Sequence, residues 1–177
     1  MKISIHDLAL EAFVPMLQSL SNFLDKAAQH ATASKLSPSI LVNARLAPDM
    51  YPLAQQVQLC CNVAEDATAR LTGREAPRAE DNEQALDDLK TRIAKTIHYL
   101  QATQAAAFDG AETREIRIDL PEAAGVFVMT GLQFLRDWAL PNFYFHVVTA
   151  YDILRHNGVD LGKRDYLSQV ARYIRPS

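Results

Sequence analysis

The amino-acid sequence predicts an all-α fold, a four-helix bundle in which a small β-hairpin is inserted before the last long helix. Apolar residues recur at steps of three and four in four long stretches, as on one face of a helix. One shorter stretch alternates apolar and charged residues, which is typical of strands. The length of 177 residues and a hydrophobic content of 49% are ordinary for a globular chain, so we expect a single domain over 1–177.

The first long helix is expected to begin after Ser4, because Asp7 three residues later completes a weak capping pattern. Pro15 is expected to kink this helix. The segment 34–52 contains three prolines and cannot continue it, so we expect a loop with one short helical turn over 39–43. The apolar positions that predict the helix are Ile5, Leu8, Ala12, Met16, Leu20, Phe23, Ala27 and Ala31.

The second and third helices follow from their caps and apolar seams. Asp49 is expected to cap the second helix, with Pro52 in its first turn, and Gly73 suits a left-handed C-cap. Asp81, with Gln84 three residues later, predicts the start of the third. The two seams are Leu53, Val57, Cys60, Ala64, Ala67 and Leu71, then Leu86, Leu89, Ile93, Ile97 and Leu100.

The hairpin is predicted by a change of period. Apolar and charged residues alternate over 115–120, a turn sequence PEAAG follows, and a second apolar run covers 126–129. We expect this hairpin to lie across one end of the helices, because two isolated strands are barely stable. The last long helix then opens at Thr130, kinks at Pro141 and ends at Gly158.

Charge and cysteine content exclude several classes of protein. The net charge is −3, and basic residues are interspersed with acidic ones, which disfavours nucleic-acid binding. Cys60 and Cys61 are adjacent on a helix, where their side chains diverge, so we expect reduced thiols. Neither a secretory signal nor an apolar run long enough for a membrane span is visible, so we expect a soluble, cytoplasmic protein.

His146 is the candidate functional residue of the last helix. At about 100° per residue it lies near 300° from Phe143, inside the apolar arc. A buried imidazole needs hydrogen-bond partners, and the candidates across the bundle are Asn43, Arg45, Asp49, Tyr51, Gln55 and Gln56. Two metal-binding histidines on one helix stand four residues apart, yet Ala150 occupies that position. We therefore favour a satisfied core or pocket residue, with a metal ligand as the alternative.

The segment before the second helix is the candidate pocket mouth. Asn43, Arg45, Asp49 and Tyr51 make it more polar than a packing role requires. The plainer interpretation is that Asp49 caps the second helix and that Arg45 pairs with a helix carboxylate.

Two stretches of this chain resemble the signature segments of an uncharacterised family of small bacterial proteins, a domain of unknown function. These stretches are LVNARLAPDMYPLAQQVQ and ALPNFYFHVVTAYDILRHNGVDLGKRDYL. The resemblance extends over nearly the whole chain and places it in the DinB-like, or YfiT-like, metalloenzyme superfamily. It implies a four-helix bundle in which three histidines hold a divalent metal such as zinc, nickel or iron. It also implies thiol transfer or amide hydrolysis.

The histidine pattern of that superfamily is incomplete in this chain. His146 matches the first histidine of an HxxxH pair on the last helix, and Ala150 stands in place of the second. The second helix, 50–71, contains no histidine. We therefore predict no cofactor and a degenerate metal site.

Three hypotheses of function follow. The first is a bundle that binds a small molecule in a cavity around His146, Asn142, Tyr144, Asp49 and Arg45, without assigned chemistry. The second is a metal-dependent thiol transferase or hydrolase with His146 as one ligand. The third is a non-enzymatic interaction protein, and we expect a homodimer because four-helix units often pair through apolar faces. Whether the protein is an enzyme stays open.

Overall fold

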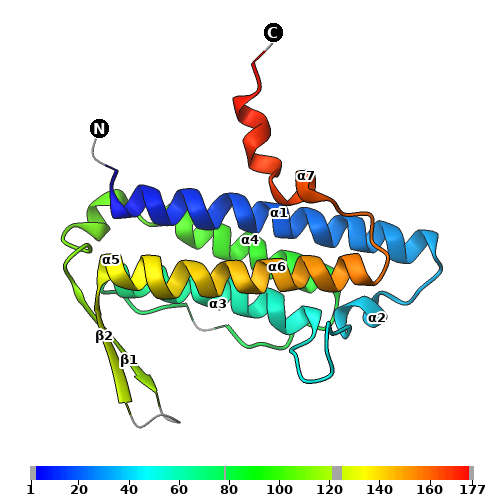
Figure 1. Ribbon diagram of the computed structural model, residues 1–177, viewed down its shortest axis with the longest axis horizontal. Helices are drawn as coiled ribbons and strands as arrows, with labels where there is room; N and C mark the ends of the chain where they lie inside the picture. The colour runs from blue at the N-terminus through cyan, green and yellow to red at the C-terminus, as the bar shows by residue number, and fades with distance from the viewer. Residues whose placement is uncertain (1–2, 78, 121–124, 176–177) are drawn as a thin grey trace.

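Four long helices lie side by side and form the body of the protein (Figure 1). The computed structural model describes residues 3–77, 79–120 and 125–175. Helix α3 packs against α6 and α4, and α1 closes the ring by packing against the same two helices. This arrangement confirms the predicted bundle. The long helices are α1 (Ile5–Ala33), α3 (Leu53–Thr72), α4 (Leu86–Ala102) and α6 (Leu140–His156).

Shorter elements connect and extend the long helices. The two predicted strands and the predicted helical turn before α3 are present, and the predicted turn residues 121–124 lie outside the described part of the chain. A 3₁₀ turn follows α4, and the chain closes with a short helix and a second 3₁₀ segment that rises away from α1 (Figure 1). These elements are α2 (Pro38–Val42), η1 (Ala105–Phe108), β1 (Glu115–Leu120), β2 (Gly125–Thr130), α5 (Gly131–Gln133), the π-helical η3 (Phe134–Ala139), α7 (Lys163–Tyr166) and η4 (Ser168–Tyr173).

Several predicted helix ends are confirmed. The hydroxyl of Ser4 accepts a hydrogen bond from the backbone N–H of Asp7 at 3.0 Å. Gly73 adopts the left-handed conformation, with φ of 71°, at the end of α3. Thr130 and Gln133 form a reciprocal capping box at the start of α5. Local sequence signals therefore mark each of these ends.

The predicted starts of α3 and α4 are wrong. Helix α3 begins at Leu53 after Pro52, and its N-cap makes no side-chain hydrogen bond, so Asp49 does not cap it. Helix α4 begins at Leu86 rather than near Asp81. The reason is tertiary, because the Asp81 carboxylate pairs with Arg92 at 2.9 Å and holds the preceding segment outside the helix.

The last long helix contains a π-helical stretch that explains how its apolar face stays continuous. In an uninterrupted α-helix Phe134 would lie about 180° from Phe143, on the opposite side. Both rings are nevertheless fully buried. The π-helical turns over η3, just before Pro141, take up one extra residue and rotate Phe134 by about 100° toward the core. Helix α1, in contrast, continues through Pro15 without interruption.

The core is filled by aromatic and aliphatic side chains from all four long helices. Phe13 of α1 packs edge-to-face on Phe143 of α6, with ring centroids 4.9 Å apart. Cys60 is fully buried on α3, which confirms its predicted core position. The largest fully buried side chains are Phe13, Phe23, Phe134, Phe143, Leu17, Leu20, Leu24, Leu41, Leu53, Leu71, Leu89 and Ile93.

The hairpin projects from one end of the bundle instead of lying across it (Figure 1). Contacts along its strands hold it against the bundle. The Arg70 guanidinium of α3 donates to the carbonyl oxygen of Arg117 at 2.8 Å, and the Phe127 ring packs against Trp138 with centroids 5.4 Å apart. Most side chains of β2 are exposed.

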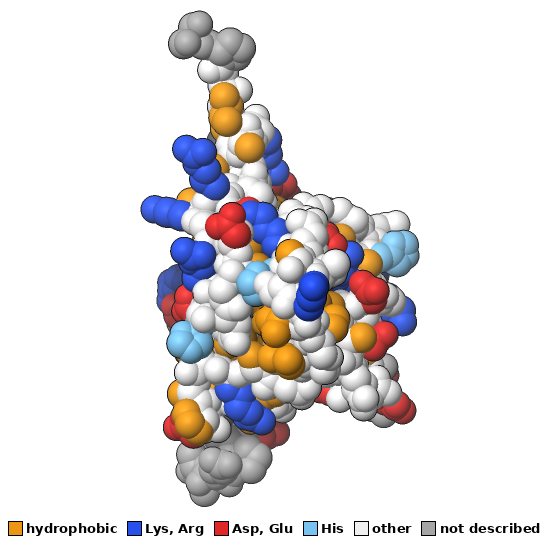
Figure 2. Space-filling view, turned by 90° about the vertical axis from the view of Figure 1, so that its right-hand side faces the viewer, with side chains coloured by type: hydrophobic (Ala, Val, Ile, Leu, Met, Phe, Trp, Pro, Cys, Tyr) orange, Lys and Arg blue, Asp and Glu red, His pale blue; other side chains and the backbone are white. Residues whose placement is uncertain are grey.

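Charged side chains of both signs are interspersed over the face shown in Figure 2, around a patch of hydrophobic side chains. This view shows no stripe of a single sign. Within the described ranges, no helix is long and apolar enough to cross a membrane.

We expect Gly131→Ala to destabilise the fold by about 3 kcal/mol, because a Cβ there would overlap the backbone carbonyl oxygen of Ala111, which cannot rotate away. Urea denaturation of the wild type and the variant measures this loss. Gly162→Ala is the matched control, since its φ is −138° and the nearest atom to a new Cβ is 3.9 Å away. A loss for Gly131→Ala no larger than that of the control would contradict the close packing.

Candidate functional site

The imidazole of His146 is half-buried between α6 and α3 and is bonded to Gln56, one of the partners expected from sequence. His146 Nδ1 lies 2.8 Å from Gln56 Oε1, and Gln56 Nε2 donates to the carbonyl oxygen of Tyr51 at 3.1 Å. Because the second bond fixes the amide orientation, the Gln56 oxygen must accept from the ring. The proton therefore resides on Nδ1, and no hydrogen bond from the described residues reaches Nε2.

The surroundings of His146 do not fit a three-histidine metal site. Burial lowers the pKa of His146 below its ordinary value of 6.5, so the ring is neutral at pH 7. Its neighbour on α3 is an amide, a poor ligand for zinc or nickel, and Ala150 supplies no donor one turn along α6. In the described parts of the chain no three His, Cys, Asp or Glu side chains gather closely enough to hold a metal ion.

The other candidate residues before α3 make local contacts. The Arg45 guanidinium donates to the carbonyl oxygen of Met50, and Asn43 Nδ2 donates to that of Ser39 at 2.8 Å. Asp49 is exposed, and no hydrogen bond joins it to His146 within the described ranges.

Of the other candidate residues on α6, Asn142 forms a hydrogen bond to the preceding turn and Tyr144 lies near α7. Asn142 Nδ2 donates to the carbonyl oxygen of Trp138 at 2.7 Å. Tyr144 is partly buried, which raises the pKa of its phenol. Burial and the nearby Tyr144 also raise the pKa of Tyr166 in α7. The structure thus links His146 through Gln56 to the backbone carbonyl of Tyr51, and no hydrogen bond among the described residues joins it to the other candidates.

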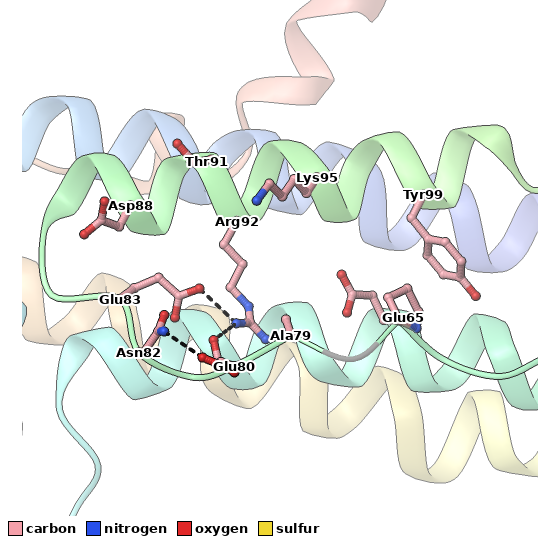
Figure 3. A pocket seen from close by; sticks show the side chains of 11 residues that line it. Glu65, Ala79, Glu80, Asn82, Glu83, Asp88, Thr91, Arg92, Lys95 and Tyr99 are labelled. Carbon is pink, nitrogen blue, oxygen red and sulfur yellow. Dashed lines mark hydrogen bonds and ion pairs between the residues drawn. The ribbon is translucent and has the colours of Figure 1, made fainter.

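A separate hollow of about 640 Å³ lies between α3, α4 and the segment that connects them (Figure 3). Its floor is the carboxylate of Glu65 on α3, and α4 supplies one wall. We call it the Glu65 hollow. Its lining residues are Glu65, Pro77, Ala79, Glu80, Asn82, Glu83, Asp88, Thr91, Arg92, Lys95 and Tyr99.

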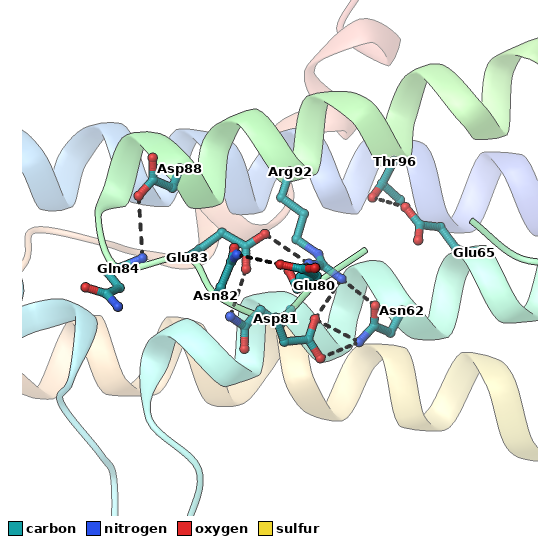
Figure 4. A network of polar contacts seen from close by, with 11 residues as sticks. Asn62, Glu65, Glu80, Asp81, Asn82, Glu83, Gln84, Asp88, Arg92 and Thr96 are labelled. Carbon is teal, nitrogen blue, oxygen red and sulfur yellow. Dashed lines mark hydrogen bonds and ion pairs between the residues drawn. The ribbon is translucent and has the colours of Figure 1, made fainter. Parts of the chain in front are cut away.

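Arg92 of α4 holds the connecting segment in place, and this segment forms the wall of the hollow that faces α4 (Figure 4). The Arg92 side chain is only 4% exposed, and its guanidinium pairs with Asp81 and Glu83, each at 2.9 Å. It also donates to the carbonyl oxygen of Glu80 at 3.3 Å and to the side-chain oxygen of Asn62. A chain segment without regular structure is thereby fixed onto α3 and α4.

Glu65 is the buried acid of the hollow, with a relative exposure of 6%. Thr96 donates to its Oε1 at 2.6 Å, and no second hydrogen bond reaches the carboxylate from the described residues. Burial raises the pKa of Glu65 above its ordinary value, and the bond from Thr96 and the charge of Arg92 offset part of this rise. Figure 3 shows the carboxylate turned into the hollow.

The Tyr99 hydroxyl lies at the same end of the hollow. Its oxygen is buried and has no hydrogen-bond partner within the described ranges. Burial raises the pKa of this phenol, and the negative charge of Glu65 raises it further. Among the described residues, one Glu65 oxygen and the Tyr99 hydroxyl are thus each left without a hydrogen bond, and a bound polar group would satisfy either of them.

The two cysteines near this site are not nucleophiles at neutral pH. Burial raises the pKa of Cys61 to about 12, although Thr96 and Arg92 both favour its thiolate. Burial also holds the pKa of Cys60 well above its ordinary value. Because the thiolate is the reactive species, neither side chain can begin a thiol-transfer reaction in the folded protein.

The Glu65 hollow was not predicted, although one signal for it exists in the sequence. The apolar seam predicted for the third helix is Leu86, Leu89, Ile93, Ile97 and Leu100. The structure buries Thr96 fully and leaves Ile97 partly exposed. A polar residue at a core position of α4 marks a buried hydrogen bond, and its partner on α3 is Glu65.

Comparison with known proteins assigns the fold and the family. A crystal structure of a DinB family member protein from Shewanella denitrificans is 43% identical to this chain, with a TM-score of 0.84, and the match covers 92% of this chain and 91% of that one. The bundle is therefore of the DinB-like class. A family model described as "Domain of unknown function (DUF1993)" matches residues 5–167, and the chain belongs to that family. No curated protein matches it.

We expect Glu65→Gln to stabilise the fold at pH 7 by about 1 kcal/mol, because the amide can still accept from Thr96 while the buried charge is removed. A group whose pKa is raised by folding weakens the fold once it ionises. The gain should therefore disappear as pH falls through the folded pKa of Glu65 toward 4.5. Thermal unfolding of both proteins between pH 4 and 8 tests this; a gain that persists at low pH would contradict it.

Proposed function

We propose that the protein binds a small molecule in the Glu65 hollow and does so without a metal ion. The observation that carries this proposal is a carboxylate, 6% exposed, that faces an open hollow with one of its two oxygens unbonded by the described residues. Burying a charge costs free energy unless it is paired. Such a cost is typical of a binding site, where a ligand supplies the missing partner.

The size and construction of the hollow support the same proposal. About 640 Å³ is within the usual range for small-molecule sites, roughly 300–1,000 Å³. Arg92 fixes one wall through two ion pairs, so the site is formed before a ligand arrives. Preorganisation of this kind reduces the entropy lost on binding.

His146 has a different role in this proposal. Its bond to Gln56 ties α6 to α3, and the degenerate donor set around it supports a metal-free protein. A metal-dependent transferase or hydrolase is the alternative, and it would require ligands that neither Gln56 nor Ala150 resembles.

We expect a fragment library to give hits whose amide chemical-shift changes centre on Thr96 and Tyr99 of α4. Ala79→Trp should abolish these changes, since Ala79 lines the hollow and a larger side chain fills it. Ala94→Trp is the matched control, because Ala94 is exposed on α4 outside the lining. Hits that map elsewhere, or that survive Ala79→Trp unchanged, would contradict the proposed site.

The metal-free character is tested separately. We expect elemental analysis of protein supplemented with zinc, nickel or iron to find far less than one metal per chain, because His146 offers a single imidazole without a second donor. Near-stoichiometric metal that is lost in His146→Ala would instead favour the metal-dependent alternative.

A further inference from the structure

We propose that the C-terminal segment is an arm that docks on helix α6 of a second copy of the chain, so that two copies associate by exchanging arms. The arm is the segment 167–175, which includes η4. This inference goes beyond the proposed function, because neither of the two surfaces that it joins lines the Glu65 hollow.

The arm is anchored on α1 through polar side chains. The hydroxyl of Ser168 shares a hydrogen bond of 2.8 Å with that of Ser19, a fully buried residue of α1. Arg172 pairs with an acid of the same helix, Glu11, at 2.9 Å. The polar side of the arm is thus the side that meets the protein.

The apolar side chains of the arm are turned toward water. Val170, Tyr173 and Ile174 are 49%, 67% and 79% exposed. The arm stands clear of the four long helices in Figure 1, and Figure 2 shows hydrophobic side chains on its surface at the top of the view. A surface helix normally buries its apolar side and exposes its polar side, and this orientation is the reverse. It indicates that another apolar surface covers the arm.

A matching apolar surface lies on the outer face of α6. There α6 and the segment before α3 form a shallow groove of about 420 Å³, which we call the α6 groove. Phe145 and Val148 of α6 are 57% and 40% exposed, and Leu46 on the other side of the groove is 40% exposed. The lining includes Leu46, Met50, Phe145, Val148 and Asp152.

Charge complementarity matches the arm to the α6 groove. Asp152 is the only charged side chain among the described residues that line the groove. Lys163 and Arg164 border the apolar side of the arm, and no acid among the described residues does so. An arm that packed on a second arm would bring these like charges together, whereas the groove offers an opposite charge.

The arm cannot reach the α6 groove of its own chain. In Figure 1 the arm stands above α1, whereas the segment 44–52 that borders the groove lies below α6, on the opposite side of the bundle. An ion pair of 2.7 Å between Asp165 and Lys26 holds the root of the arm on α1. The groove of a second copy is therefore the partner, and exchange of both arms closes a dimer. A membrane would cover the arm but leave the α6 groove uncovered.

Sedimentation velocity of the full-length chain over a range of concentrations tests this inference. We expect a monomer–dimer equilibrium. Ile174→Asp in the arm and Phe145→Arg in the groove should each weaken the dimer at least about tenfold, because each places a charge in an apolar contact. An equimolar mixture of the two variants should dimerise more tightly than either variant alone, since it keeps one unaltered arm and one unaltered groove.

Leu36→Asp and Leu36→Arg are the matched controls, because Leu36 is 38% exposed and lines neither surface. They should change the dimer affinity by less than about threefold. A monomer at every concentration, a dimer indifferent to either substitution, or a mixture no tighter than its components would overturn the inference. Monomeric protein that binds vesicles of anionic phospholipid, and loses this binding in Ile174→Asp, would overturn it in favour of a membrane surface.

Discussion

The buried guanidinium of Arg92 is the interaction on which the proposed site depends. It lies on α4, reaches the segment before that helix and pairs there with Asp81 and Glu83. Gln58 of α3 donates to the second oxygen of Glu83 at 2.8 Å, so the segment is held from both helices. Breaking a buried ion pair leaves an uncompensated charge and costs about 3–5 kcal/mol. The part of the wall around Asp81 and Glu83 is therefore tied to both helices, although it contains no regular secondary structure.

This arrangement separates two polar sites that share α3. Near the start of the helix Gln56 and His146 share a hydrogen bond that holds α3 and α6 together. Further along α3, Glu65 faces α4 and keeps one oxygen free of hydrogen bonds from the described residues. A satisfied pair stabilises a fold, whereas a half-satisfied buried acid weakens it. On that physical ground the second site is the better candidate for binding.

The fold could be predicted from sequence because its signals are local. The helical period, the Ser4 cap, the left-handed Gly73 and the Thr130 capping box each depend on a few neighbouring residues. The predicted start of α4 is wrong because a tertiary ion pair holds Asp81 outside the helix, and that of α3 is wrong because Asp49 makes no capping bond. The π-helical turn before Pro141 was also not predicted. In the sequence, its extra residue shows only as a change of phase between the apolar positions before it and those after it.

The candidate site was less predictable because its partners are far apart in the chain. Arg92 and Asn62 are 30 residues apart, and Glu65 and Thr96 are 31 apart. His146 was visible because it interrupts an apolar run, and Gln56 was one of six partners considered for it.

The burial of both native thiols has a practical consequence for spectroscopy. Cys60 and Cys61 have no exposed surface, and their thiolates are suppressed. Maleimide dyes and nitroxide labels, which need an accessible thiolate, should leave the folded chain untouched. A cysteine introduced on the surface could then carry a single fluorophore or spin label without replacing either core residue.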